Sequence, residues 1–197
     1  MKVKVTPSKV HGNVKIPASK SMAHRALICA SLSDGTSLVS NVTNSKDIEA
    51  TVGCMKALGA KIKQIDKTTY EVTGTNLFKQ EGNITCNANE SGSTLRFLIP
   101  LAACTNAKVK FLGHGRLLQR PMDVYANEFK EQNIEFNQSD KEIIVSGNLQ
   151  AKDYVVQGDI SSQFITGFMF VLPLLDQDST LTITEPYESK SYVNLTI

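Results

Sequence analysis

Apolar and polar residues follow two periods along this chain, and the order of those periods recurs. A period of two, typical of strands, alternates with a period near 3.6, typical of helices. We predict helices after Ser19 and Ser45, the first with Met22, Ala26, Cys29 and Ala30 on its buried face. The strands predicted around them are residues 2–6, Val14–Ile16, Leu38–Val42, 61–65 and Tyr70–Thr73.

The same order of strands and helices then repeats twice. In the second copy, strands are predicted at Ile84–Cys86 and Val109–Leu112, helices from Ser91 and Pro121, and a hairpin around Asp140–Lys141. In the third copy, strands are predicted at Tyr154–Val156 and Leu181–Thr184, with a helix from Ser161 between them.

The register of the copies predicts the fold. Val14, Ile84 and Tyr154 are 70 residues apart, and so are Ser21, Ser91 and Ser161. We therefore predict an α/β fold of repeated βαβαββ units around a pseudo-threefold axis, with units 13–74, 83–147 and 153–197. The third copy lacks the hairpin that closes the first two, so we expect a fold truncated in the third unit.

The amino-acid composition limits the classes of function that fit this chain. The 21 basic and 19 acidic residues among 197 give a net charge of +2, which does not favour a nucleic-acid partner. Cys29, Cys54, Cys86 and Cys104 have no metal-ligand spacing and lie among apolar residues, so we expect reduced core cysteines in a cytoplasmic protein. The apolar run Phe164–Leu175 is too short for a membrane span and predicts a buried helix.

Candidate chemistry gathers where the first helix begins. Ser19, Lys20, Ser21 and Arg25 occupy its first turns, where unpaired N–H groups already favour an anion. A lysine and an arginine there suggest a phosphate or carboxylate site. The alternative is a serine N-cap on a surface helix with two solvated cations.

The other units repeat this feature. Their helices open with Ser91-Gly92-Ser93-Thr94 and with Ser161-Ser162-Gln163. Further polar residues precede or begin the second helices, namely Arg120, Ser189, Lys190 and Tyr192. If the helix starts converge, they form a cationic, hydroxyl-rich surface suited to a small polyanionic polyol. Taken singly, each serine is explained by N-capping.

At these residues the sequence resembles the 5-enolpyruvylshikimate-3-phosphate synthases. The motifs that carry the resemblance are Pro17–Ser21 with Arg25, Ser91–Arg96, Gln119–Met122, Gly158–Phe164 and Ser189–Tyr192. The resemblance implies a monomeric shikimate-pathway transferase for aromatic amino acid biosynthesis, with no metal or organic cofactor. Its two domains would close over the substrates, with residues 1–11 as a strand paired with a C-terminal domain and 12–197 as an incomplete N-terminal domain.

The resemblance also implies the reaction and the residues for it. The enolpyruvyl group of phosphoenolpyruvate would pass to the 5-hydroxyl of shikimate 3-phosphate, releasing phosphate. Lys20 would touch both substrates, as a group in the proton transfers or as a charge clamp. The further substrate contacts implied are Ser21, Arg25, Ser161, Ser162, Gln163, Ser189 and Tyr192 for shikimate 3-phosphate, and Gly92, Arg120 and again Gln163 for phosphoenolpyruvate. Ser93 is predicted as a further substrate contact.

Two departures from the family pattern and two rival functions accompany this interpretation. Glu90 stands where many relatives have Asn, and Ser93 where they have Thr. The acidic Glu90 would repel anionic substrates if it pointed inward. The UDP-N-acetylglucosamine enolpyruvyl transferases share the architecture but carry a reactive cysteine where this chain has Gly115. The family's catalytic carboxylates belong to the C-terminal domain, so the chain alone could instead be a binding half without activity.

Overall fold

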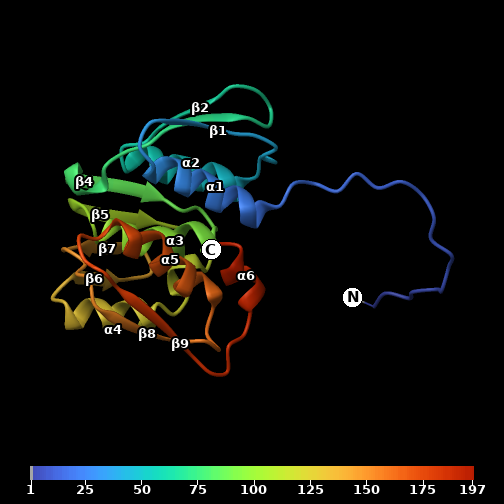
Figure 1. The fold of residues 1–197 in the computed structure, drawn as a ribbon. Coiled ribbons are helices and arrows are strands. Elements are labelled where there is room, and N and C mark those ends of the chain that lie inside the picture. Colours follow the sequence, from blue (N-terminus) through green and yellow to red (C-terminus); the bar gives the residue numbers. More distant parts are fainter. Residues whose placement is uncertain (1) are drawn as a thin grey trace.

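The computed structural model describes residues 2–197, and its ribbon is shown in Figure 1. The first unit contains α1 (Lys20–Leu32), β1 (Thr36–Val39), α2 (Lys46–Ala57), β2 (Lys61–Gln64) and β3 (Tyr70–Thr73). After the short 3-10 helix η1 (Leu77–Lys79), the second unit contains β4 (Glu81–Asn87), α3 (Gly92–Ala102), β5 (Asn106–Leu112), η2 (Leu117–Gln119), α4 (Asp123–Glu131), β6 (Glu135–Gln138) and β7 (Ile143–Ser146). The third contains β8 (Asp153–Gln157), α5 (Ser162–Val171), η3 (Leu172–Leu174), β9 (Thr180–Thr184) and α6 (Lys190–Asn194).

The three sheets confirm the predicted repeat. The second sheet has the order β4-β5-β7-β6, in which β4 and β5 are parallel and the other pairs antiparallel. The first sheet, β1-β3-β2, has the order of the last three of these strands, and β8 and β9 form a parallel pair like β4 and β5. Each parallel pair is joined by one helix, α3 or α5, as a βαβ crossover requires.

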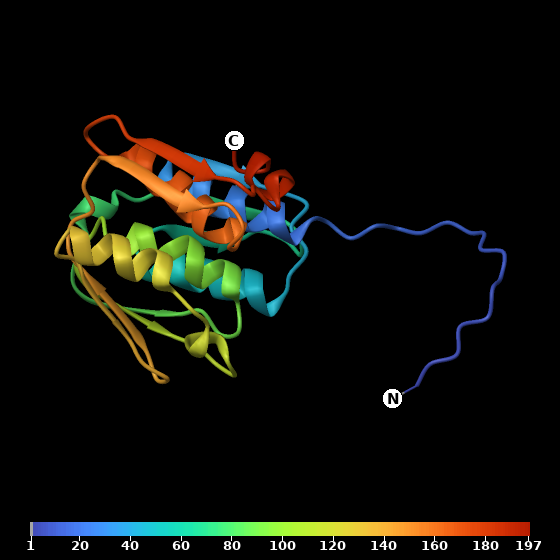
Figure 2. The ribbon, with the colours of Figure 1, turned by 90° about the horizontal axis from the view of Figure 1, so that it is seen from below.

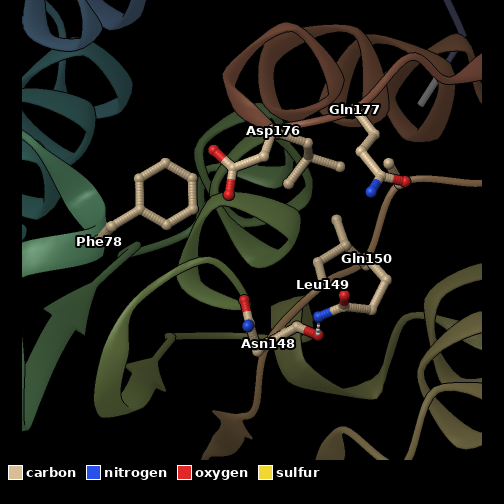
Figure 3. Close-up of a pocket in the computed structure, with 8 residues that line it drawn as sticks. Phe78, Asn148, Leu149, Gln150, Asp176 and Gln177 are labelled. Atoms are coloured by element: carbon tan, nitrogen blue, oxygen red, sulfur yellow. Dashed lines mark hydrogen bonds between the residues drawn. The ribbon is translucent and has the colours of Figure 1, made fainter.

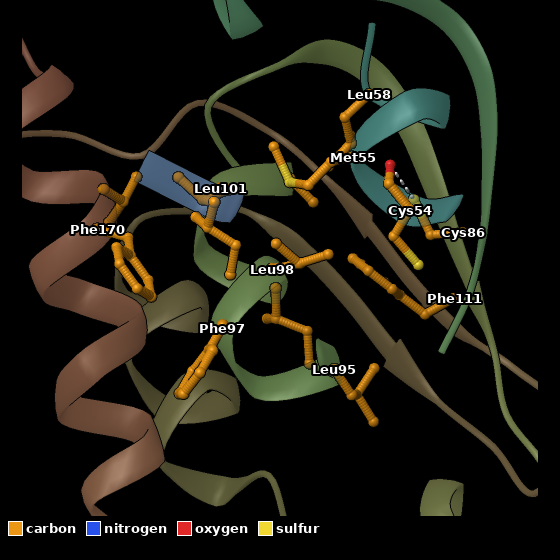
Figure 4. Close-up of a cluster of buried hydrophobic side chains, with 14 of the residues drawn as sticks. Cys54, Met55, Leu58, Cys86, Leu95, Phe97, Leu98, Leu101, Phe111 and Phe170 are labelled. Atoms are coloured by element: carbon orange, nitrogen blue, oxygen red, sulfur yellow. Dashed lines mark hydrogen bonds between the residues drawn. The ribbon is translucent and has the colours of Figure 1, made fainter. Parts of the chain in front are cut away.

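The helices α3 and α5 lie inside the molecule and the sheets outside, whereas α4 and α6 lie at the surface (Figures 1 and 2). The α3 helix is buried on nearly all sides, which is unusual for a helix of a small protein. Apolar side chains of α2, β4, β5 and α5 surround it, and Figure 4 shows Leu95, Leu98 and Leu101 among them. The sheets therefore form a shell around α3 and α5, and these two helices bring their N-terminal ends to one side of the molecule.

The strands predicted at residues 2–6 and Val14–Ile16 are not formed. Residues 2–19 have no regular structure and extend away from the body (Figure 1). Val3, Val5, Val10, Val14 and Ile16 are 71% to 96% exposed. An alternating pattern forms a strand only where a neighbour pairs its backbone, and no sheet lies beside this arm. The pairing of residues 1–11 with another domain stays a prediction, and Met1 lies outside the described residues.

The buried face of α1 also differs from the prediction. Met22 is 44% exposed and Cys29 is exposed, whereas Ala23, Leu27 and Ile28 are buried. The sequence contains two apolar stripes one residue apart, and the body packs against the one with the larger side chains. Three of the four cysteines lie in the core as expected, and Cys29 does not.

The other boundary differences are small. The β1 strand is Thr36–Val39 instead of Leu38–Val42, and α4 begins at Asp123, two residues after Pro121. The apolar run after Phe164 forms a buried helix, as predicted. None of the helices in residues 2–197 is long and apolar enough to cross a membrane.

Candidate functional site

A polar cavity of about 330 Å³ lies where α1, α3, α5 and α6 approach one another. Eight of the predicted site residues line it together with Phe97: Ser21, Arg25, Ser93, Ser161, Ser162, Gln163, Ser189 and Tyr192. These residues come from all three units, so the repeat does bring the helix starts to a common place. The cavity is hydroxyl-rich, as expected for a polyol ligand.

Serine side chains cap the three first helices of the units. Ser19 accepts a hydrogen bond from the backbone N–H of Met22 at 3.3 Å, and Ser91 accepts one from Thr94 at 3.2 Å. Ser161 accepts one from Gln163 at 3.3 Å. The cap of α1 is therefore Ser19 and not Ser21, which lies inside the helix and faces the cavity. Ser91 is buried and does not line the cavity.

Arg25 is the buried cation of the cavity, with 6% of its surface exposed. Its guanidinium donates to the hydroxyls of Thr196 at 2.8 Å and Thr166 at 3.2 Å. It also donates to the carbonyls of Ser21 and Tyr192, both at 2.9 Å. Burial lowers the pKa of Arg25 from its ordinary value, so an anion in the cavity would favour its charged form.

A second arginine enters the site through a side-chain relay. Arg96 donates from Nη1 to Oε1 of Gln163 at 2.8 Å, and Nε2 of Gln163 donates to Oγ of Ser93 at 2.9 Å. The relay joins α3 to α5 and orients the amide of Gln163. Burial, and then the charge of Arg120, lower the pKa of Arg96.

Gly92 lies between these two arginines at the start of α3. A Cβ on Gly92 would be 2.5 Å from Nη1 of Arg120 and 3.4 Å from Nη1 of Arg96. The missing side chain therefore lets both guanidinium groups approach the N-terminal end of the helix. Gly92 and Arg120 do not line the 330 Å³ cavity, but they adjoin Ser93, which does.

The positive charge of this region is unbalanced. Within residues 2–197, all five ion pairs use lysines, so no carboxylate pairs with Arg25, Arg96 or Arg120. Lys20 forms an ion pair with Asp47 at the start of α2 and stays half exposed. Three arginines without counter-ions beside helix N-terminal ends suit a ligand with more than one negative charge.

Glu90 does not face the cavity. Its Oε1 would lie 2.9 Å from a Cβ on Gly115, so the carboxylate rests against the loop that follows β5. Gly115 has a φ of +61°, a left-handed conformation in which a side chain such as cysteine is disfavoured. Glu90 and Gly115 therefore lie against each other.

Sequence reasoning missed the supports of the site. Arg96 ends the motif Ser91–Arg96, but no role was assigned to it from the sequence. It follows the first residue of its motif at nearly the same spacing as Arg25 follows Ser19. Phe97 holds the guanidinium of Arg25 over its ring, with the guanidinium carbon 5.2 Å from the ring centroid. Thr166 and Thr196 orient Arg25 from distant segments, and no local signal marks them.

A second cavity, of about 200 Å³, has different chemistry (Figure 3). Phe78, Asp176 and amide side chains line it, without a cation, so it does not suit an anionic ligand. Among residues 2–197, no group of three or more His, Cys, Asp or Glu side chains could hold a metal ion.

Comparison with known proteins identifies one family. A family model described as EPSP synthase (3-phosphoshikimate 1-carboxyvinyltransferase) matches residues 5–197. The 3-phosphoshikimate 1-carboxyvinyltransferase of Clostridium perfringens strain SM101 is 48% identical over 198 residues, which are 100% of this chain and 46% of that protein. The protein of the same name from Clostridium kluyveri is 48% identical over 197 residues, which are 99% of this chain and 46% of that protein.

Solved structures agree as well. EPSP synthase from Acinetobacter baumannii matches with a TM-score of 0.76 and 18% identity, over 93% of this chain and 42% of that one. That identity shows the fold alone, and the chain spans about half the length of the curated relatives it matches. The family model, however, covers every helix and strand described above, and on that evidence this chain belongs to the EPSP synthase family.

Proposed function

We propose that this chain supplies the shikimate 3-phosphate-binding half of a 3-phosphoshikimate 1-carboxyvinyltransferase. The observation that carries the proposal is the cavity itself, where Arg25 has no carboxylate partner and hydroxyls of three units surround it. A phosphate is bound by a guanidinium and by helix N–H groups. The hydroxyls of a polyol ring are matched by serines and by the amide of Gln163.

Phosphoenolpyruvate would bind beside this ligand, at the start of α3. Arg120 and Arg96 flank Gly92 there, and neither has an acidic partner among the described residues. Two guanidinium groups match the carboxylate and the phosphate of one small molecule. In this proposal the two substrates would lie next to each other, with Ser93 and Gln163 between them.

In the proposed reaction, the 5-hydroxyl of shikimate 3-phosphate attacks the central carbon of phosphoenolpyruvate while the methylene carbon gains a proton. The tetrahedral adduct then releases phosphate while its methyl group gives up a proton, which restores the double bond. Both steps need fixed positive charge at the anionic oxygens and a group that moves protons. Lys20 precedes Ser21, which lines the cavity, and we propose it as a charge clamp or a proton carrier, although it is paired in this structure with Asp47.

We propose that turnover also needs groups outside this chain. No carboxylate lines the cavity in the described part of the chain, and Asp47 is occupied by Lys20. A C-terminal domain of the same enzyme is the expected source. A phosphate-release assay should therefore detect turnover only when that domain is supplied, and turnover by this chain alone would contradict the division of labour. The expected cytoplasmic location rests on the free cysteines and is tested by cell fractionation.

The proposed function is tested by titration calorimetry with shikimate 3-phosphate. The chain should bind it, and bind shikimate without the phosphate much more weakly. Arg25→Ala should weaken binding by about 10- to 100-fold, because a charged hydrogen bond to phosphate contributes roughly 1.5–3 kcal/mol. Lys63→Ala is the matched control, since it removes an exposed positive charge on β2, away from the cavity. Undiminished binding by Arg25→Ala would refute the assignment of the cavity.

A further inference from the structure

A chain of buried polar side chains crosses the apolar interior next to the cavity. Nδ1 of His24 lies 2.7 Å from the hydroxyl of Thr51, and that hydroxyl lies 2.7 Å from the hydroxyl of Thr94. The Thr94 hydroxyl in turn lies 2.7 Å from Oγ of Ser91. All four residues are at most 2% exposed. They come from α1, α2, α3 and the residue that caps α3, so one hydrogen-bonded network joins three helices.

The direction of the hydrogen bonds follows from their acceptors. The single proton of the Thr94 hydroxyl has two acceptors on the side away from Thr51, namely Oγ of Ser91 at 2.7 Å and the backbone carbonyl of Asp47 at 3.3 Å, which can only accept. A hydroxyl has one proton to donate, so Thr94 accepts from Thr51, and Thr51 accepts from His24. Nδ1 of His24 therefore carries a proton, and the ring is neutral because a second proton on Nε2 would have no acceptor. Its Nε2 is buried without a partner, and the ring meets Phe97 edge-on at 6.3 Å.

Both ends of this hydrogen-bonded network adjoin the proposed site. The network contacts the backbone carbonyl of Asp47, whose carboxylate forms an ion pair with Lys20. Ser91, which receives the other end, caps the helix whose next residues are Gly92 and Ser93. His24 itself lies one turn after Lys20 and contacts Phe97, which lines the cavity.

A contribution to the stability of the protein does not by itself account for such a network. A buried polar network contributes little net free energy compared with apolar side chains of the same shape, which could pack here without any hydrogen bonds. What the network does supply is direction, because each hydrogen bond fixes the distance and orientation between two helices. The positions it fixes are the N-terminal ends of α1, α2 and α3.

We propose that His24, Thr51 and Thr94 are positioning residues that set the spacing of these three helix ends for substrate binding. This inference rests on the proposed function, because the helix ends matter through the ligand that they bind. None of the three side chains lines the cavity, so each acts through Lys20, Gly92 and Ser93.

The test uses two substitutions at one buried position. Thr51→Val keeps the volume and removes the hydroxyl, whereas Thr51→Ser keeps the hydroxyl. Thr105→Val is the matched control, because Thr105 is also buried and hydrogen-bonded. It follows the C-terminal end of α3, and this end lies about 16 Å from the N-terminal end of the helix. For each variant, calorimetry measures the dissociation constant of shikimate 3-phosphate, and amide NMR measures the signals of Gly92 and Ser93.

We expect Thr51→Val to weaken binding about tenfold and to shift both amide signals, as coupling within a hydrogen-bonded network of this kind implies. Thr51→Ser and Thr105→Val should bind within about twofold of the unmodified chain. If Thr51→Val binds as tightly as the unmodified chain and leaves both signals in place, the proposal is overturned. If the unmodified chain does not bind the ligand at all, the proposed function fails, and the two amide signals still decide whether the network positions the helix ends.

Discussion

Arg25 shows how a single residue depends on distant parts of the chain. Its place one turn into a helix is local, and the sequence suffices to suggest it as an anion contact. Its orientation comes from Thr166 on α5 and Thr196 near the end of the chain. The guanidinium is held before any ligand arrives, which reduces the entropy that binding must remove.

His24 makes a prediction about pH. Burial lowers the pKa of His24 from 6.5 to about 4. The unfolded chain therefore takes up this proton at a higher pH than the folded chain, so stability falls as the pH falls from about 6.5 to about 4. The full effect is about 3 kcal/mol, since one pKa unit corresponds to about 1.4 kcal/mol.

The effect is measured by urea unfolding at several values between pH 7 and pH 4. His24→Asn keeps a side chain that can hydrogen-bond to Thr51 but does not titrate. The free energy of unfolding of the unmodified chain should therefore fall more steeply with acid than that of the variant. Because carboxylates titrate in both proteins, their contribution cancels in the comparison. Parallel curves would contradict a neutral buried His24.

At the scale of elements, the contact between α3 and α5 places Arg96 and Gln163 side by side. The hydroxyl of Tyr125 on α4 donates to the carbonyls of Arg96 at 2.7 Å and Phe164 at 3.2 Å, and so bridges the two helices. Gly167 makes room for this arrangement. A Cβ on Gly167 would collide with the Tyr125 hydroxyl and lie 2.7 Å from the carbonyl oxygen of Arg96.

Gly167→Ala should therefore destabilise the protein by about 3 kcal/mol, through overpacking and the loss of the Tyr125 hydrogen bonds. Gly53→Ala provides the control, because Gly53 lies in α2 with no atom within 4 Å of an added Cβ. That variant should be more stable by roughly 0.5–1 kcal/mol, since alanine favours a helix over glycine. Thermal unfolding of both variants measures the contrast, and equal effects would argue against the close α3–α5 packing.

At the scale of the whole molecule, the arm of residues 2–19 stands apart from the body. Its valines and isoleucine are exposed, and within it only Ser19, at the start of α1, forms a side-chain hydrogen bond. Deleting residues 2–11 should therefore change the melting temperature by less than about 2 °C.

Limited trypsin digestion measures the same property directly. Lys4, Lys9 and Lys15 lie in the arm, and the protease should cut there before it cuts the body. The trimmed product should unfold at the temperature of the full chain. A large loss of stability on trimming would mean that the arm packs on the body, contrary to the structure.

The sequence predicted the elements of the second and third units with only small errors at their ends. It failed for the arm and for the face of α1 because both depend on a neighbour. A strand pattern needs a strand beside it, and two apolar stripes on one helix are distinguished only by what packs against them. Eight of the predicted residues line one cavity, and they were predicted from a local signature, namely polar and cationic side chains at helix starts.

The sequence by itself determined the repeat, the helix starts and the kind of ligand they favour, because periodicity, capping and charge are local properties. Only the tertiary structure decided that Ser91 turns inward while Ser93 faces the cavity, and that His24 connects three helices. Those features follow from contacts between residues more than 25 positions apart, and such contacts leave no period in the sequence.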